Sequence, residues 1–228
     1  GHRRCAQAFG SEQPAAMQAL RQAVDATDPA TAALAQALAP WDFSDIVLTP
    51  PTRCIDGDVC LDLDGLPIEL LYVGPAHTAG DVMVHLPEQR VLFTGDIIFR
   101  LCTPIAWVGT FAQWERALDR IIAVQPEVIV PGHGPLCGVE GARDMQEYLA
   151  YVRTESARFY QMELSPVDAA TRIDLGPYAN WTEPERIIFH VARAYRELSG
   201  EACAPASLDP RQLVAQMYAV KTARTRCC

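Results

Sequence analysis

Between Ile46 and Val130 the chain consists of short apolar, β-branched runs separated by turn residues, and this alternation restricts the fold more than any other feature. The runs are VCLDLD, IELLYVG, DVMVHL, VLFTGD and EVIVPG. Runs of this length and composition predict strands, and LPEQR predicts a hairpin between the third and the fourth. One helix, from about Phe111 to Val124, is expected before the last strand.

The regions on either side of the strands are predicted to be helical. Residues 14–39 are rich in Ala, Gln and Leu and are interrupted by Pro29, so two short helices are expected there. From Gly138 to Ser199, apolar residues recur at helical spacing in AYVRTESARFY and PERIIFHVARAYREL. Strands, a crossover helix and further helices predict a layered α/β domain. The last residues, KTARTRCC, are expected to be a frayed end.

Composition restricts the class of protein. A chain of 228 residues that is 50% hydrophobic has enough apolar material for one sizeable core. Lys and Arg number 19 against 28 Asp and Glu, giving a net charge of −9, which argues against a nucleic-acid partner. No stretch approaches the roughly 18 apolar residues of a membrane span, and no signal-peptide pattern is present. The sequence therefore predicts a soluble, cytoplasmic protein without a membrane partner.

Three segments each place one side chain that could bind a metal ion at the end of a predicted strand. They carry His77 in GPAHTAGD, Asp96 in VLFTGD and His133 in VIVPGHG. Taken singly, His77 could be a surface residue and Asp96 a helix cap or turn carboxylate, whereas the glycines around His133 leave its ring free. All three follow the same order of strand, Gly and ligand. His and Asp without Cys suit Zn²⁺, with Fe or Mn as alternatives, and leave positions for water as in catalytic sites.

These motifs carry a family resemblance. GPAHTAGDVMVHLPEQRVLFTGDIIF, followed by VIVPGHGP, resembles the second half of the metallo-β-lactamase superfamily over about residues 46–200. In that family the matching segments supply the third His, the bridging Asp and the last His of a two-metal site. The resemblance implies that His77 binds the first metal, that Asp96 bridges both ions as the catalytic carboxylate, and that His133 binds the second. The expected fold is the αββα sandwich of that family, with a helical C-terminal extension.

The family's H-x-H-x-D-H segment is absent from this sequence. The resemblance implies that this segment and the first strands lie upstream of Gly1, so the chain is expected to be N-terminally truncated, with the second half of the fold largely present. Residues 1–200 would then form an incomplete metallo-β-lactamase-like domain, and residues 201–228 a C-terminal tail. Weak metal binding and reduced stability are expected of such a chain.

For the intact protein, the resemblance implies hydrolysis of a small acyl substrate (a thioester, ester or lactam) by a water activated on two zinc ions. The helical part resembles bacterial hydrolases of unassigned substrate and aromatic polyketide cyclase/thioesterases, and it lacks the tail expected of hydroxyacylglutathione hydrolases. Two alternatives stay open: a polyketide cyclase/thioesterase-type activity, or a non-catalytic module that kept the fold without a complete metal site. The oligomeric state is not indicated by the sequence.

Several side chains after Asp96 lie near the predicted metal site in the sequence. Arg100 and Trp107 are candidates for substrate binding, because an aromatic-lined entrance suits a bulky acyl group. Phe111 and Trp114 are expected to pack the following helix onto the sheet instead.

Two further histidines are expected to be structural. His190 lies among apolar residues at helical spacing, which favours a core or boundary position over a catalytic one. His85 falls inside a predicted strand and is expected to face outward.

Overall fold

The structure, a computed structural model, describes residues 1–4, 13–200 and 210–226. Its centre is a five-stranded sheet in the order β1-β2-β3-β4-β5. The strands are β1 (Val59–Leu63), β2 (Leu66–Tyr72), β3 (Val82–Leu86), β4 (Val91–Phe99) and β5 (Val128–His133). Strands β1 to β4 pair antiparallel, whereas β5 runs parallel to β4. The hairpin predicted at LPEQR is confirmed as the connection between β3 and β4.

The crossover between the parallel strands is helix α4 (Phe111–Val124), which has the predicted bounds. It begins where Thr110 and Gln113 form a capping box, each side chain bonding the other's backbone N–H. Such a box satisfies N–H groups that the first helical turn leaves free. Its last turn ends at Gln125, which adopts the left-handed conformation that commonly terminates helices.

Two aromatic side chains hold α4 on the sheet, as predicted. Phe111 is 2% exposed and Trp114 is 1% exposed. The Trp114 indole Nε1 donates to the Ile97 carbonyl of β4 at 3.0 Å, so its polar atom is satisfied although it is buried. The helix is therefore fixed to β4 by both apolar packing and a buried hydrogen bond.

One face of the sheet is covered and the other is largely open. The covered face carries Leu71, Met83, Leu92 and Ile129, which belong to the core beneath α4 and α5 (Glu140–Gln161). Strand pairing joins another apolar row across all five strands on the opposite face. That row consists of Val59, Leu70, Val84, Phe93 and Val130. Its members are half-buried or exposed, and we call this surface the open face.

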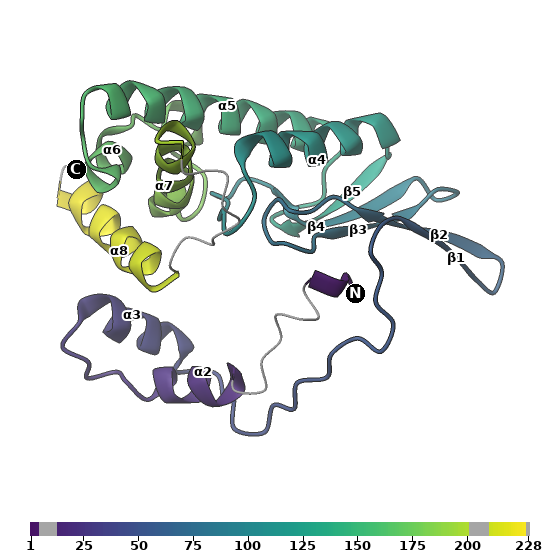
Figure 1. Cartoon of the computed structure of the whole chain (residues 1–228), viewed down its shortest axis with the longest axis horizontal. Coiled ribbons are helices and arrows are strands. Elements are labelled where there is room, and N and C mark those ends of the chain that lie inside the picture. Colours follow the sequence, from purple (N-terminus) through teal and green to yellow (C-terminus); the bar gives the residue numbers. More distant parts are fainter. Residues whose placement is uncertain (5–12, 201–209, 227–228) are drawn as a thin grey trace.

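Helices form the second layer of the core (Figure 1). They are α5 (Glu140–Gln161), α6 (Pro166–Arg172), α7 (Ile187–Leu198) and α8 (Pro210–Arg226), with two short 3₁₀ turns at Gly176–Tyr178 and Pro184–Arg186. Helix α7 packs on α5, and α8 contacts both α6 and α7. Among the described residues, no helix is long and apolar enough to cross a membrane.

The C-terminal residues differ from the expected frayed end. Helix α8 continues to Arg226, and Val220 within it is fully buried. The Arg224 guanidinium donates to the carbonyls of Ala170 and Ile173 at 2.6 and 2.9 Å. Both carbonyls lie at the C-terminal end of α6, so contacts with another helix order a segment whose own sequence does not predict a regular structure. Cys227 and Cys228 lie outside the described residues.

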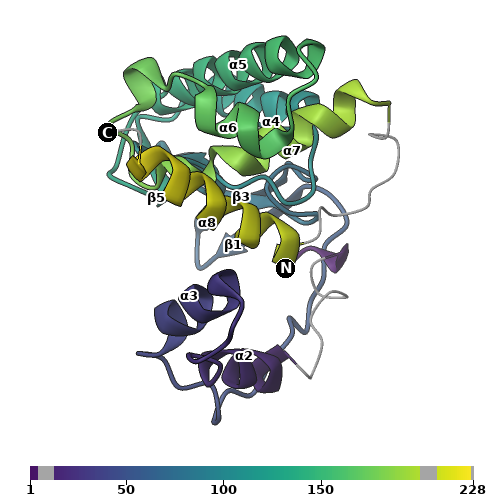
Figure 2. The same ribbon diagram turned by 90° about the vertical axis from the view of Figure 1, so that its left-hand side faces the viewer.

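Residues 13–38 form the two short helices that were predicted, α2 (Gln13–Arg21) and α3 (Pro29–Leu38). Asp28 caps α3 by accepting from the Thr31 N–H at 2.8 Å. Figures 1 and 2 show this pair set apart from the sheet, and α3 contacts α8. An extended segment then returns to β1.

The structure confirms one of the two histidine predictions and corrects the other. His190 is 1% exposed within α7, as expected for a core residue. His85 is 9% exposed and does not face outward. It lies on the same side of β3 as Met83, opposite Glu69 of β2, and its Nδ1 lies 2.8 Å from the Glu69 Oε2. The charged partner on the neighbouring strand makes this inward position favourable.

Candidate functional site

Three segments meet at one edge of the sheet. Because β2 and β4 are each antiparallel to β3, β2 runs in the same direction as β4 and β5. His77 lies in the loop after β2, and His133 is the last residue of β5. Asp96 does not end its strand as predicted, because β4 continues to Phe99. Pairing with β5 is irregular around Gly95, whose φ is +52°, and this bulge directs Asp96 to the edge.

The Asp96 carboxylate lies between the two imidazoles. Its Oδ2 is 3.4 Å from the Nε2 of His77, and its Oδ1 is 3.5 Å from the Nε2 of His133. A direct N–H···O hydrogen bond spans about 2.7–3.2 Å. Two donors that each lie about 2.0–2.1 Å from one tetrahedral zinc ion are about 3.4 Å apart. The observed separations therefore suit a pair of ligands sharing a cation better than a direct hydrogen bond.

The orientation of His77 is set by the loop before α4. Its Nδ1 lies 2.7 Å from the carbonyl of Ile105, which can only accept, so Nδ1 carries a proton and donates. In the neutral ring Nε2 then presents a lone pair toward Asp96. The rings of Phe99 and Trp114 lie within 5.7 and 6.2 Å of the imidazole, which is 8% exposed. Metal-binding histidines are commonly oriented by a carbonyl in this way.

His133 is more exposed and is held mainly by stacking and by its backbone. Its ring lies nearly parallel to that of Phe99 at 4.6 Å, and its carbonyl accepts from the Arg100 N–H at 2.8 Å. The preceding residue must be small, because a Cβ on Gly132 would collide with the Asp96 Oδ1 and lie 2.7 Å from the Gly95 carbonyl carbon. The absence of a side chain at Gly132 therefore lets β5 approach the Asp96 carboxylate.

Asp81 stabilises the loop that carries His77, and the sequence analysis missed it. Its carboxylate accepts from the backbone N–H groups of Ala76 and Thr78 at 3.0 Å and from the Thr78 hydroxyl at 2.5 Å. Burial raises the pKa of Asp81, although these donors oppose the effect. The spacing of Thr78 and Asp81 in HTAGD is typical of a side chain that closes a turn, and could have indicated this role.

A hollow of about 280 Å³ opens beside the His77 and Asp96 side chains. It is lined by His77, Thr78, Asp81, Val82, Thr94, Gly95 and Asp96. Because a water molecule takes up about 30 Å³ in the liquid, the hollow has room for several waters or a small substrate group.

Comparison with known proteins points to a family. Residues 56–133, which hold all three side chains, match the family model of the metallo-beta-lactamase superfamily. Over these residues the chain is similar to the metallo-beta-lactamase superfamily. The structure is similar in fold to a double mutant of the sec-alkyl sulfatase PisA1, an enzyme from Pseudomonas sp., with a TM-score of 0.51 and 18% identity. That similarity covers 72% of this chain and 29% of the other.

The matches to curated relatives cover less of this chain than the structural similarity does. A metallo-beta-lactamase type 2 of Bacteroides fragilis is 30% identical over 98 residues, covering 41% of this chain and 39% of the relative. A linear primary-alkylsulfatase of Pseudomonas sp. is 25% identical over 139 residues, covering 56% and 26%. A hydroxyacylglutathione hydrolase of Rhizobium meliloti is 32% identical over 69 residues, covering 30% and 27%. The chain thus spans only about a quarter to two fifths of these relatives.

The donor atoms fit part of a superfamily metal site. Within residues 1–4, 13–200 and 210–226, no group of three or more His, Cys, Asp or Glu side chains is placed to hold one metal ion. Among these residues, three donors do not converge on one point, because Asp96 offers a different oxygen to each imidazole. The described side chains therefore supply two donors at each of two positions. Nitrogen and carboxylate donors suit zinc, but a zinc ion takes four ligands, so each position is incomplete.

The two candidate substrate-binding residues face the helical layer. The guanidinium of Arg100 forms an ion pair with Asp144 of α5. The indole of Trp107 packs edge-on against Phe189 of α7, with ring centroids 5.0 Å apart. These contacts give both side chains a structural role, and their part in substrate binding stays a prediction.

Proposed function

We propose that this protein is a metal-dependent hydrolase of acyl substrates, with His77, Asp96 and His133 as ligands of two zinc ions. The observation that carries the proposal is the position of Asp96, with its two oxygens 3.4 and 3.5 Å from two separate Nε2 atoms. The superfamily match over residues 56–133 supports a hydrolytic activity. Thioesters, esters and lactams are the proposed substrate class.

The proposed roles follow from the side chains. A bound pair of ions would lower the pKa of a water molecule and polarise a substrate carbonyl. Asp96 would hold the two positions at a fixed distance, and its negative charge would offset part of the concentrated positive charge. The Ile105 carbonyl keeps the proton of His77 on Nδ1, so that Nε2 is free to bind. Asp81 keeps the His77 loop closed through its contacts with Ala76 and Thr78.

A second candidate function is a non-catalytic module with the same fold. The observation that favours it is the lack, among the described residues, of three donors around one position. Such a module would bind zinc weakly and leave acyl substrates intact. The two functions differ in turnover, so metal binding and hydrolysis must be measured separately.

The test compares Asp96→Asn with Asp25→Asn, which changes an exposed aspartate in the turn after α2. Asparagine keeps the shape of Asp96 but removes the charge and one anionic donor. Zinc affinity is measured by competition with a chromophoric chelator. It is expected to fall at least about tenfold in Asp96→Asn, because a carboxylate oxygen binds a dication mainly through electrostatic attraction. The absorption spectrum of the protein loaded with Co²⁺ in place of zinc should also differ between Asp96→Asn and the parent protein. Asp25→Asn should leave both unchanged.

Hydrolysis of a panel of aryl esters, thioesters and lactams is measured on the same variants. Loss of about a hundredfold in Asp96→Asn is expected, since metal polarisation is worth several kcal/mol in the transition state. Equal zinc affinity in Asp96→Asn and the parent protein would show that Asp96 is no ligand. Zinc binding that depends on Asp96 without turnover of any substrate would favour the non-catalytic module.

A further inference from the structure

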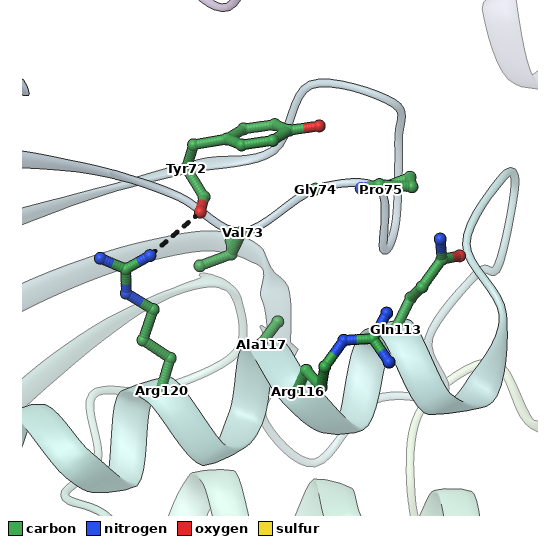
Figure 3. A pocket seen from close by; sticks show the side chains of 8 residues that line it. All are labelled: Tyr72, Val73, Gly74, Pro75, Gln113, Arg116, Ala117 and Arg120. Carbon is green, nitrogen blue, oxygen red and sulfur yellow. Dashed lines mark hydrogen bonds between the residues drawn. The ribbon is translucent and has the colours of Figure 1, made fainter. Parts of the chain in front are cut away.

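A second hollow, of about 250 Å³, lies between the end of β2 and one face of α4 (Figure 3). Four helical residues line it at positions i, i+3, i+4 and i+7, which fall on one side of a helix. They are Gln113, Arg116, Ala117 and Arg120. The opposite wall is the segment 72–75, which leads directly into the loop of His77. Its chemistry differs from that of the site at Asp96, because no acidic side chain lines it.

Hydrogen-bond donors dominate this hollow. Arg116 is exposed and has no ion-pair partner within the described ranges. The Oε1 of Gln113 accepts from the Thr110 N–H at 2.8 Å, which fixes the amide and leaves its Nε2 as a donor. Figure 3 shows the Gln113 amide and the Arg116 guanidinium lying near each other beside Pro75. Two side chains on successive turns therefore present N–H groups to the same space.

Arg120 adds charge on the next turn of α4. Its Nη1 donates to the Tyr72 carbonyl at 3.2 Å, and its Nη2 pairs with Asp58. A guanidinium has five N–H donors, so these two contacts leave others free. Asp58 offsets the charge of Arg120, and Arg116 keeps the local balance positive in a chain whose net charge is −9.

The remaining lining is apolar. Val73, Pro75 and Ala117 form the wall between the donors (Figure 3). A purely inorganic ion would gain little from these residues, whereas an organic group attached to the anion would bury some apolar surface against them. The hollow thus combines a cationic rim with a small apolar wall.

We propose that this hollow binds a phosphate or sulfate group, held by Arg116 and Gln113. Guanidinium groups bind such oxyanions through paired, charge-assisted hydrogen bonds. The proposal does not depend on the metal site, since none of its donors is a proposed metal ligand. Both the free ion and a phosphomonoester carry the required group, and the apolar wall favours the ester.

The experiment titrates the 228-residue protein with inorganic phosphate, sulfate, phenyl phosphate and acetate by calorimetry, at constant ionic strength set with chloride. Constant salt is needed because exposed charges are screened within about 10 Å at 0.1 M. Saturable binding of phosphate or sulfate is expected, tighter for phenyl phosphate and weaker for acetate. Absence of saturable binding by every phosphate and sulfate compound would overturn the proposal. Equal affinity for phosphate and acetate would overturn it as well.

Variants locate the site. Arg116→Gln is expected to weaken phenyl phosphate binding about tenfold, because it removes the charge-assisted hydrogen bonds of the guanidinium. Arg116→Lys keeps the positive charge but loses the planar pair of N–H donors of the guanidinium. Its affinity for phenyl phosphate should therefore lie between those of the parent protein and Arg116→Gln. The matched control is Arg143→Gln, which removes an exposed arginine from α5. If Arg116→Gln and Arg143→Gln weaken binding equally, the effect is one of net charge and the site does not exist.

Discussion

The two faces of the sheet have similar apolar sequences and different surroundings. Leu92 and Phe93 are neighbours in β4, yet Leu92 is fully buried beneath the helices and Phe93 is 41% exposed on the open face. Across the strands, Phe93 pairs with Val84 on one side and Val130 on the other. Alternation of apolar and polar residues, typical of a sheet with one solvated face, is therefore absent from the inner strands.

This difference separates what a strand sequence determines from what packing adds. The apolar residues on both faces favour strand formation equally, but only the face under α4 and α5 gains the free energy of burial. A partly exposed apolar row of this kind, in which Phe93 is exposed and the other four residues are half-buried, is typical of an interaction surface or a site of self-association. Substitutions on the two faces should therefore have effects of different size and kind.

The largest contrast is expected between Leu92→Ala and Phe93→Ala. Leu92→Ala leaves a cavity under the helices and should lower the free energy of unfolding by about 2–5 kcal/mol. Phe93→Ala removes a side chain already in contact with water, and should cost less than about 1 kcal/mol. Urea denaturation followed by circular dichroism measures both. Equal losses would show that the open face is covered in solution.

The covered layer should also make stability depend on pH through His190. Burial, with a smaller contribution from Arg193, lowers the pKa of His190 to about 3. Neither ring nitrogen has a hydrogen-bond partner among the residues that the structure describes. A histidine whose pKa falls on folding stabilises the fold fully above its unfolded pKa of about 6.5. That stability is lost as the pH falls from about 6.5 toward 3, at up to about 1.4 kcal/mol per pH unit.

The variant His190→Leu tests this dependence, because leucine has a similar size to histidine, is apolar, and carries no titrating group. Thermal unfolding between pH 7.5 and 4.5 should show a flatter pH dependence in the variant than in the parent protein. Parallel curves for the two proteins would mean that other groups cause the acid sensitivity.

The smallest effect on stability is expected on the open face, where Phe93→Glu should change solution behaviour instead. A charge at this position interrupts the apolar row and should reduce dye binding by anilinonaphthalene sulfonate and light scattering at high concentration. Gln89→Glu adds the same charge in the turn between β3 and β4, where the side chain is exposed. If both variants behave alike, net charge rather than the open face controls association.

Local signals made much of the fold predictable. Helix α4 could be placed correctly because its apolar residues recur at helical spacing, and the Thr110 and Gln113 box found in the structure marks its start. The three ligand candidates could be found because each comes with or shortly after an apolar strand sequence, although Asp96 lies inside β4 and only His77 follows its strand. The common direction of β2, β4 and β5 brings the three segments to one edge. Their distances to one another could not be predicted, since these depend on the bulge at Gly95.

The errors arose where distant residues decide the outcome. His85 faces inward because Glu69 lies opposite it on another strand, and the sequence near His85 contains no sign of that pairing. The tail is ordered because Arg224 reaches carbonyls at the end of α6. Asp81 is different, because its partners Ala76 and Thr78 are close in sequence and the segment HTAGD already contained the signal for its role.

The contact between Gly132 and Asp96 bears on any attempt to engineer this protein. A mutant library aimed at new substrates would naturally randomise the residues beside the hollow, and Gly132 would be among them. Any side chain there would push apart β4 and β5 at the point where they place Asp96 and His133. Variation is better directed at Val82, which lines the hollow and is only half-buried, than at Thr94, which is 1% exposed between β4 and β5.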